Sequence, residues 1–297
     1  MKQNTAILLL LILLGCSRTW GQEIHSNVDS LLSISDKYSE HNTDSAFHFA
    51  FMAAEQSQLK NFPALLAKSY QSIAALYDKI DDANKTIVFY ERALAQVQKS
   101  GDEKLTTELT YEVANSHFIK GSYDKAELYY RKARQLAEKY QNNDIIYKVV
   151  IDMVYFYSII GNVQQDSVRH YIAQGLKIAG MLNDSIKIAK LFKAYSGLFL
   201  PIKEYDSSLV YVKRALEIYK KKNDNEGLTD GYKSLGDIYW YKKDNIQAKK
   251  CYSLAYEYGK KTNSTNSIAF LACDLAYMYA QENNKPELDK FALESIT

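Results

Sequence analysis

The segment YKSLGDIY (residues 232–239), followed by AKKCYSLA (residues 248–255), is the clearest copy of a pattern that recurs along this chain. In its second part, Ala248 and Ala255 lie seven residues apart and therefore share one face of a helix, with Tyr252 between them. Small residues at that spacing let a second helix approach closely, and neighbouring aromatic residues fill the space beside them. The segment therefore predicts two packed helices joined by a short turn.

The alanine of the second helix returns at a nearly constant interval. Successive copies are 40, 40, 40, 42 and 40 residues apart: Ala53, Ala93, Ala133, Ala173, Ala215 and Ala255. The position seven residues earlier is often small: Ala46, Thr86, Ala126, Asp166, Ser208 and Ala248. The position sixteen residues earlier is mostly aromatic: Lys37, Tyr77, His117, Tyr157, Phe199 and Tyr239, with Tyr279 continuing the series. Such self-similarity predicts a helical repeat array, with units near 27–66, 67–106, 107–146, 147–188, 189–228, 229–268 and 269–297.

These motifs resemble the tetratricopeptide repeat (TPR), which has large-x2-Leu-Gly-x2-Tyr in its first helix and Ala-x3-aromatic in its second. The resemblance covers residues 25–297, and the interval is about six residues longer than the usual ~34, which implies longer helices. It implies an all-α TPR solenoid, a right-handed superhelix of about seven helix-turn-helix repeats of period about 40. First helices line the concave groove of such arrays.

Helix boundaries are marked by residues with special backbone preferences. Gly121 and Gly161 are predicted in turns, and Asp102 and Asn183 at helix N-termini. The prolines also fit boundaries: Pro63 opens a helix, Pro201 closes one and Pro286 opens the last. The unit 189–228 contains Pro201 and is assigned the two-residue insertion, so we expect a local bend there.

The N-terminus has the pattern of an export signal. Lys2 is followed by an unbroken apolar run over residues 6–15, which is too short to span a bilayer as a helix. Residues 13–16 read LLGC, which resembles a bacterial lipobox and predicts lipidation of Cys16 with a signal over residues 1–15. Cleavage after Gly21 is the alternative, with a signal peptide over 1–21 and a repeat array over 22–297. We expect a periplasmic or lipid-anchored protein of the bacterial cell envelope.

Composition and charge exclude several classes of protein. With 47% hydrophobic and 24% charged residues, the chain is neither disordered nor collagen-like. The net charge is +2, and removal of Lys2 and Arg18 with the signal leaves 35 basic and 35 acidic residues, so bulk charge favours no nucleic acid. The sequence lacks a phosphate loop, Gly-x-Ser-x-Gly and His-Glu-x-x-His. We therefore expect no enzyme, no cofactor and no metal.

The spacing of the histidines and cysteines does not match that of metal-ligand motifs. His117 and His170 are expected in the core, because they fall near the aromatic packing positions. Export would permit a disulfide between Cys251 and Cys273, but the repeat frame does not aim the two side chains at each other.

The groove is the remaining candidate site. The resemblance implies that positions 2, 5, 9, 12 and 13 of each unit line it: Lys68, Gln71, Asp78, Tyr111, Asn115, Phe118, Tyr155, Lys190, Lys193, Asp237, Trp240, Tyr241 and Tyr277. Aromatic rings among lysines and amides suit an extended peptide, a partner helix or a sugar ring. Alternatively, long helices bring some of these rings into the core. Some TPR domains bind a C-terminal carboxylate with a lysine–asparagine clamp; Lys233 matches the lysine, but Asp237 replaces the asparagine.

Three functions fit this sequence. The first is a non-catalytic scaffold that holds a peptide or protein segment in the groove. The second is the sensory half of a TPR-linked transcriptional regulator or histidine kinase that lacks its membrane helix and output domain. The third is a glycan-binding lipoprotein, although such proteins usually have long loops beyond the repeats.

Overall fold

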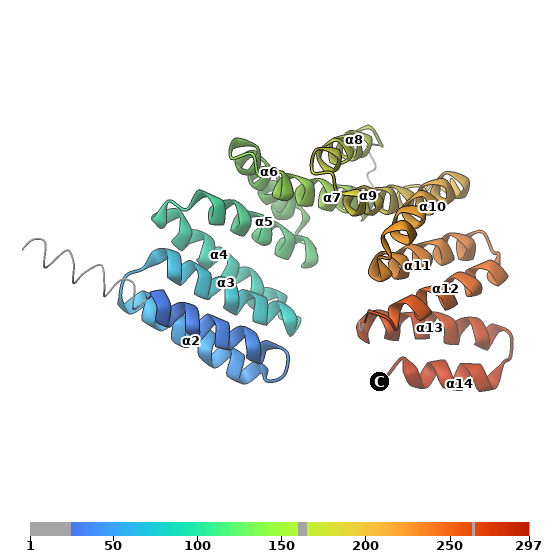
Figure 1. Cartoon of the computed structure of the whole chain (residues 1–297), viewed down its shortest axis with the longest axis horizontal. Helices are drawn as coiled ribbons and strands as arrows, with labels where there is room; N and C mark the ends of the chain where they lie inside the picture. The colour runs from blue at the N-terminus through green and yellow to red at the C-terminus, as the bar shows by residue number, and fades with distance from the viewer. Residues whose placement is uncertain (1–24, 160–164, 263–264, 297) are drawn as a thin grey trace, which may run out of the picture. The chain divides into compact units, whose positions relative to one another are not determined.

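The computed structural model describes residues 25–159, 165–262 and 265–296, and within these ranges all regular structure is helical (Figure 1). A helix over residues 25–39 comes first. It is followed by α2 (Thr43–Leu59), α3 (Pro63–Lys79), α4 (Ala83–Ser100), α5 (Glu103–Ile119), α6 (Tyr123–Lys139), α7 (Asn143–Ile159), α8 (Gln165–Met181), α9 (Ser185–Gly197), α10 (Tyr205–Lys222), α11 (Asn225–Tyr241), α12 (Asn245–Gly259), α13 (Thr265–Gln281) and α14 (Lys285–Glu294).

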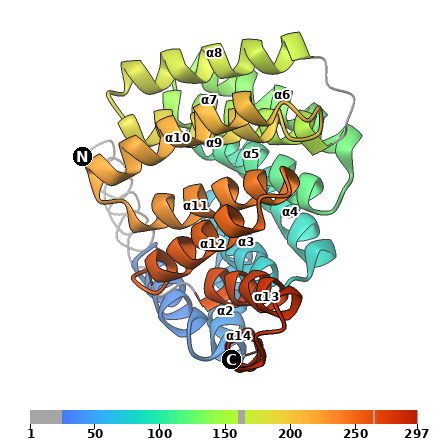
Figure 2. The ribbon, with the colours of Figure 1, turned by 90° about the vertical axis from the view of Figure 1, so that its right-hand side faces the viewer.

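The chain divides into two compact units, Met1–Val149 (unit 1) and Val150–Thr297 (unit 2), and α7 crosses the boundary. In unit 1, each helix from α2 to α6 packs against the next one along the chain. In unit 2, the same holds from α8 to α14, and this succession can be followed in Figure 2. Packing between sequence neighbours is the mark of a solenoid. The predicted all-α TPR fold is therefore confirmed, with an A-helix followed by a B-helix in each repeat.

The turns between helices follow a 20-residue interval. A residue with positive φ ends most helices of the described ranges: Asn61, Asp81, Gly101, Gly121, Gln141, Asn183, Lys203, Asn223, Lys243 and Asn283. Glycine, asparagine and aspartate tolerate this left-handed conformation best. In several turns the next residue is an aspartate whose carboxylate accepts a backbone N–H of the following helix: Asp82, Asp102, Asp184, Asp224 and Asp244. One residue thus reverses the chain, and the next one caps the new helix.

The boundary predictions are mostly confirmed. Asp102 caps α5, and Gly121 has a φ of 78° in the turn before α6. The prediction for Asn183 is wrong: it is the left-handed residue, with a φ of 53°, and Asp184 is the cap. Pro63 and Pro286 lie in the first turns of α3 and α14, and Pro201 follows the end of α9. Gly161 lies outside the described residues.

The register of the fourth repeat differs from the prediction. Ala173 is exposed, whereas Gly175 is buried, and a Cβ on Gly175 would lie 2.8 Å from Leu191 Cδ2. Seven residues before Gly175, Val168 is 1% exposed, like the small residues at that place in the other repeats. The two extra residues therefore fall between Tyr157 and Val168, and the predicted insertion near Pro201 is wrong. The close contact of α8 with α9 selects glycine at 175.

A stacked pair of rings joins the two helices of most repeats. The pairs are Tyr77–Phe89, His117–Tyr129, Tyr157–Tyr171, Phe199–Tyr211 and Tyr279–Phe291, with ring centroids 5.4 to 5.9 Å apart and interplanar angles of 2° to 25°. In three of them a cation three residues after the B-helix ring lies over that ring: Arg92, Lys132 and Arg214. Aromatic pairs of this kind add about 0.5–1.5 kcal/mol beyond the area they bury.

The remaining histidine and cysteine predictions have mixed outcomes. His117 is confirmed as a core residue, but His170 is exposed and contacts Gln174, so its prediction is wrong. Cys251 takes the ring position beside Tyr239 in the sixth repeat. It is buried, and burial raises the pKa of its thiol to about 11. Both Cys251 and Cys273 are free thiols.

The buried imidazole of His117 makes stability depend on pH. Glu91 Oε1 lies 3.4 Å from its Nε2, yet neither ring nitrogen makes a hydrogen bond within the described part of the chain. Burial lowers the pKa of His117, and the contact with Glu91 offsets this only in part. The unfolded chain therefore binds this proton at a higher pH than the folded chain. The stabilisation by neutral His117 is complete above the pKa of the unfolded state and is lost as the pH falls from there through the lower pKa of the folded state.

We expect His117→Phe to flatten this dependence. Guanidinium titrations of the wild type and the variant between about pH 7.5 and about pH 5 measure it. The free energy of unfolding of the wild type should fall more steeply with decreasing pH than that of His117→Phe. Parallel pH profiles would contradict the assignment. His170→Phe, at an exposed histidine, is the control and should keep the wild-type slope.

Candidate functional site

A pocket of about 410 Å³ lies on the A-helix side of unit 2. Its lining comes mainly from α11, α12 and α13: Leu200, Asp237, Trp240, Tyr241, Tyr252, Asp274, Tyr277 and Met278. Asp237, Trp240, Tyr241 and Tyr277 belong to the predicted groove residues. The structure thus brings four of these residues from two successive A-helices to one place.

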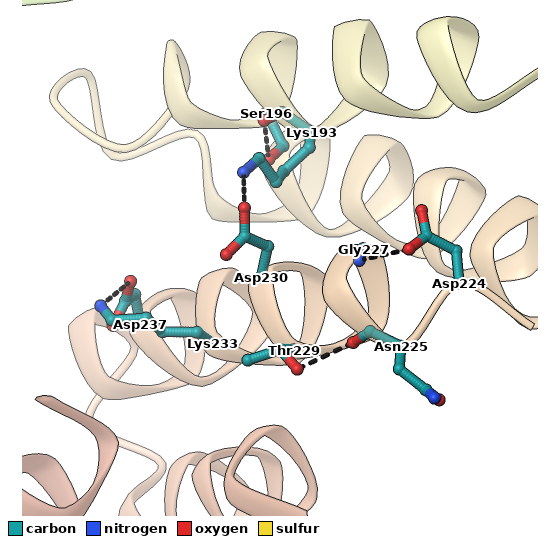
Figure 3. A network of polar contacts seen from close by, with 9 residues as sticks. All are labelled: Lys193, Ser196, Asp224, Asn225, Gly227, Thr229, Asp230, Lys233 and Asp237. Atoms are coloured by element: carbon teal, nitrogen blue, oxygen red, sulfur yellow. Dashed lines mark hydrogen bonds and ion pairs between the residues drawn. The ribbon is translucent and has the colours of Figure 1, made fainter. Parts of the chain in front are cut away.

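A network of polar contacts forms one side of this pocket. The hydroxyl of Tyr252 donates to Asp237 Oδ1 at 2.8 Å. The ammonium of Lys233 lies 3.4 Å from Asp237 Oδ2 and 4.0 Å from Asp274 Oδ2. Figure 3 shows the side chains of Lys233 and Asp237 turned toward each other along α11. Two carboxylates from neighbouring helices therefore share one cation.

Gly236 permits the contact between Tyr252 and Asp237. A Cβ at Gly236 would lie 2.6 Å from Cε1 of the Tyr252 ring. The missing side chain lets the ring pack directly on α11, where its hydroxyl reaches the carboxylate one residue further along. The Leu235–Gly236 motif that marks the repeat in the sequence thus also shapes the pocket.

The burial of these groups shifts their protonation. Burial raises the pKa of Asp274; Lys233 opposes this shift and the neighbouring Asp237 carboxylate adds to it. Burial, followed by the charge of Asp237, raises the pKa of the Tyr252 hydroxyl far above its usual range, so it remains a hydrogen-bond donor. Among the described residues, the polar contact of Asp274 is the 4.0 Å approach of Lys233. The charge of Asp274 is therefore less compensated than that of Asp237.

Aromatic rings form the opposite side of the pocket. The rings of Trp240 and Tyr277 are 5.4 Å apart at 74°, an edge-to-face arrangement. Tyr241 and Tyr277 are 56% and 55% exposed, so both present ring area to solvent. Exposed aromatic area beside a polar pocket is typical of surfaces that anchor a partner.

Lys193 continues the polar surface onto α9. Its ammonium lies 2.5 Å from Asp230 Oδ2 on α11, and Figure 3 shows this ion pair bridging the two helices. Burial opposes its charge, but Tyr155 and Asp230 outweigh that effect and raise the pKa of Lys193. The opposite charges of Lys193 and Asp230 therefore balance each other.

The other predicted groove residues are not among the side chains that line the pocket. Tyr111 is 9% exposed, stands 6.2 Å from the ring of Tyr130 and has Lys148 over its face, so it is a core residue rather than an accessible contact. Asn115 and Phe118 on α5 are half-buried. The set is completed by Lys68, Gln71 and Asp78 on α3, Tyr155 on α7 and Lys190 on α9. Lys68, Asp78 and Lys190 are exposed, and Gln71 and Tyr155 are half-buried. Lys68, Gln71, Asp78, Tyr111, Asn115 and Phe118 belong to unit 1, and the remaining seven belong to unit 2.

Sequence reasoning missed Asp274 and Tyr252 as pocket residues. Asp274 stands at position 6 of its unit, outside the groove positions that TPR arrays use. Tyr252 falls at a packing position, and its hydroxyl gains a role only because Gly236 admits the ring. An acidic residue one helical turn before Tyr277 was the available signal.

A larger cavity of about 680 Å³ lies in unit 1, between α4 and α6 over the start of α5. Leu94, Ala95 and Leu136 contribute to its apolar lining. The lysines at its rim already have partners: Lys132 lies over the ring of Tyr129, and Lys139 donates to the hydroxyl of Tyr140. Both lysines that line this cavity are therefore engaged within unit 1.

Within the described ranges, no group of three or more histidine, cysteine, aspartate or glutamate residues could hold a metal ion. None of the described helices combines the length and the apolar character that a membrane span needs. Cys16 and the rest of residues 1–24 lie outside the description.

No protein-family model and no curated protein matches the sequence. Solved structures do match its fold. The apo form of RapI has 13% identity and a TM-score of 0.68, over 91% of this chain and 96% of that chain. The Rap conjugation gene regulator of plasmid pLS20, in complex with the Phr* peptide, has 16% identity and a TM-score of 0.58, over 93% and 76%.

A third match is a STAND protein with a tetratricopeptide repeat sensor from Pyrococcus horikoshii, with 17% identity and a TM-score of 0.56. The match covers 91% of this chain and 44% of that protein. The chain has a TPR fold. At these identities the likeness concerns the fold alone.

Proposed function

We propose that this chain is a non-catalytic binding protein of the bacterial cell envelope, which holds a peptide or protein segment against the A-helices of unit 2. The observation that carries the proposal is the pocket between α11 and α13, where Trp240, Tyr241 and Tyr277 stand beside two carboxylates. Rigid aromatic rings with a few polar groups are the usual anchors of protein recognition.

The geometry favours a peptide over a transformed substrate. The contacts of Asp237 with Tyr252 and Lys233 hold these three side chains in place, so they form one side of a binding pocket. The Lys193–Asp230 pair, which joins α9 to α11, adds polar groups further along α11 for a ligand longer than one residue. One structure of similar fold is a complex with a peptide, which supports the same class of ligand here.

The place of action is proposed from the N-terminus. An apolar run over residues 6–15 after Lys2 supports export, and residues 13–16 support a lipid anchor on Cys16. The sensory-half alternative shares this location and this groove. It differs from the scaffold in that binding would be transmitted to an output domain. Its support is the likeness in fold to a protein with a TPR sensor.

Site-specific photo-crosslinking in native cell envelopes tests the binding site. A benzophenone amino acid replaces Tyr241 in the tagged chain, and Ile246 on α12, which is 77% exposed, is the matched control position. We expect the probe at Tyr241 to crosslink one defined segment of one protein. Adding Trp240→Ala and Tyr277→Ala should lower the yield at least about tenfold, because hot-spot rings carry most of the binding energy.

Two results would contradict the proposal. Equal crosslinking from Tyr241 and Ile246 would remove the pocket from the interface. Saturable quenching of Trp240 fluorescence by a glycan, without any protein crosslink at Tyr241, would replace the peptide with a sugar. Thermal unfolding of each variant serves as the check that the fold is kept.

A further inference from the structure

We propose that the pocket between α11 and α13 receives the guanidinium group of an arginine side chain from the bound segment. This inference rests on the proposed peptide-binding function and names the residue type that the segment would contribute. It follows from the balance of charge in the pocket, from the hydrogen bonds still available there and from the form of the aromatic wall.

The pocket carries one formal negative charge in excess. Asp237 and Asp274 share the single ammonium of Lys233, which lies 3.4 Å and 4.0 Å from them. The cation of Lys193 on α9 is already paired with Asp230 at 2.5 Å. A cationic side chain is therefore the complement of this pocket, and an acidic one would be repelled.

The available hydrogen bonds favour a donor with several N–H groups. Asp237 already accepts from the hydroxyl of Tyr252 at 2.8 Å, whereas the 4.0 Å from Asp274 to Lys233 exceeds hydrogen-bond length. Asp274 thus has carboxylate lone pairs to offer. A guanidinium has five N–H donors in a planar fork and can address Asp274 and Asp237 together, whereas an ammonium acts as a point charge.

The aromatic wall selects a flat cation. Trp240 and Tyr277 meet edge to face at 5.4 Å, and the residues Tyr241 and Tyr277 are each more than half exposed. Guanidinium groups stack on such rings and gain cation–π attraction there. The same chain already uses this contact internally, where Arg92 lies 5.0 Å from the centroid of the Phe89 ring. The volume of about 410 Å³ admits one such side chain.

Nuclear magnetic resonance on the full chain carrying Trp20→Phe tests the inference, because Trp240 is then the one tryptophan. The probes are N-acetyl-arginine amide, its neutral isostere N-acetyl-citrulline amide and N-acetyl-lysine amide. We expect saturable shifts of the Trp240 indole N–H with the arginine probe and at least about tenfold weaker binding of citrulline. Asp274→Asn should weaken arginine binding about tenfold and leave citrulline unchanged.

Asp289→Asn is the matched control, since Asp289 is an exposed aspartate of α14 outside the pocket, and it should stay within about twofold of the wild type. Equal affinity for arginine and citrulline, equal affinity for arginine and lysine, or an unchanged affinity in Asp274→Asn would each overturn the inference. The proposed function and the arginine inference can fail separately. A peptide crosslink at Tyr241 that survives Asp274→Asn would support the proposed function and contradict the arginine inference.

Discussion

Gly227→Ala is expected to destabilise unit 2 by about 3 kcal/mol, although alanine is the better helix former. Gly227 lies in the first turn of α11, and a Cβ there would overlap the ring of Tyr219, whose Cγ would be only 2.6 Å away. Tyr219 is 1% exposed on α10, so its ring has no free space into which it could move. Overpacking at this contact should outweigh the gain in helix propensity of about 1 kcal/mol.

Guanidinium unfolding followed by Trp240 fluorescence, in the Trp20→Phe background, measures this loss within α11 itself. Gly180→Ala is the matched control, because a Cβ at this helical glycine of α8 would meet nothing within 4 Å. That substitution should stabilise the chain by up to about 1 kcal/mol. If Gly227→Ala also stabilised the chain, the tight packing of α10 on α11 would be refuted.

Phe89→Ala is expected to cost unit 1 about 3–5 kcal/mol, the usual loss for truncating a buried ring. Phe89 stacks on Tyr77 at 5.4 Å and also meets Phe51 and Tyr70, at 5.9 and 5.8 Å between centroids. Arg92 covers its other side. The substitution therefore removes the B-helix ring of a repeat, together with contacts to α2 and α3.

Far-UV circular dichroism during guanidinium unfolding reports this loss. Phe270→Ala is the control, because Phe270 is 69% exposed on α13 and should change the free energy of unfolding by less than about 1 kcal/mol. Phe89→Leu should lie between the two. A cost for Phe89→Ala as small as that of Phe270→Ala would show that the recurring ring pairs contribute little to stability.

The proposed site was only partly accessible from the sequence. Asp237, Trp240, Tyr241 and Tyr277 stand at groove positions of two successive repeats, and the structure brings them into one pocket. Tyr111 stands at another groove position, the fifth of its repeat, and is buried, because Lys148 and Tyr130 cover it. Groove positions differ in exposure because neighbouring side chains, which repeat less strictly than the small residues, decide how much of each ring is covered.

The sequence by itself determined the helix pairs, their period and the alternation of small and aromatic residues. These features are local, since each depends on spacing within one helix or across one turn. The tertiary structure decided that Gly175, rather than Ala173, carries the small position of the fourth repeat, because the approach of Leu191 leaves no room for a Cβ. It also decided that Asp274 and Tyr252 join Asp237. That meeting depends on the distance and rotation between three helices, which no spacing along the chain encodes.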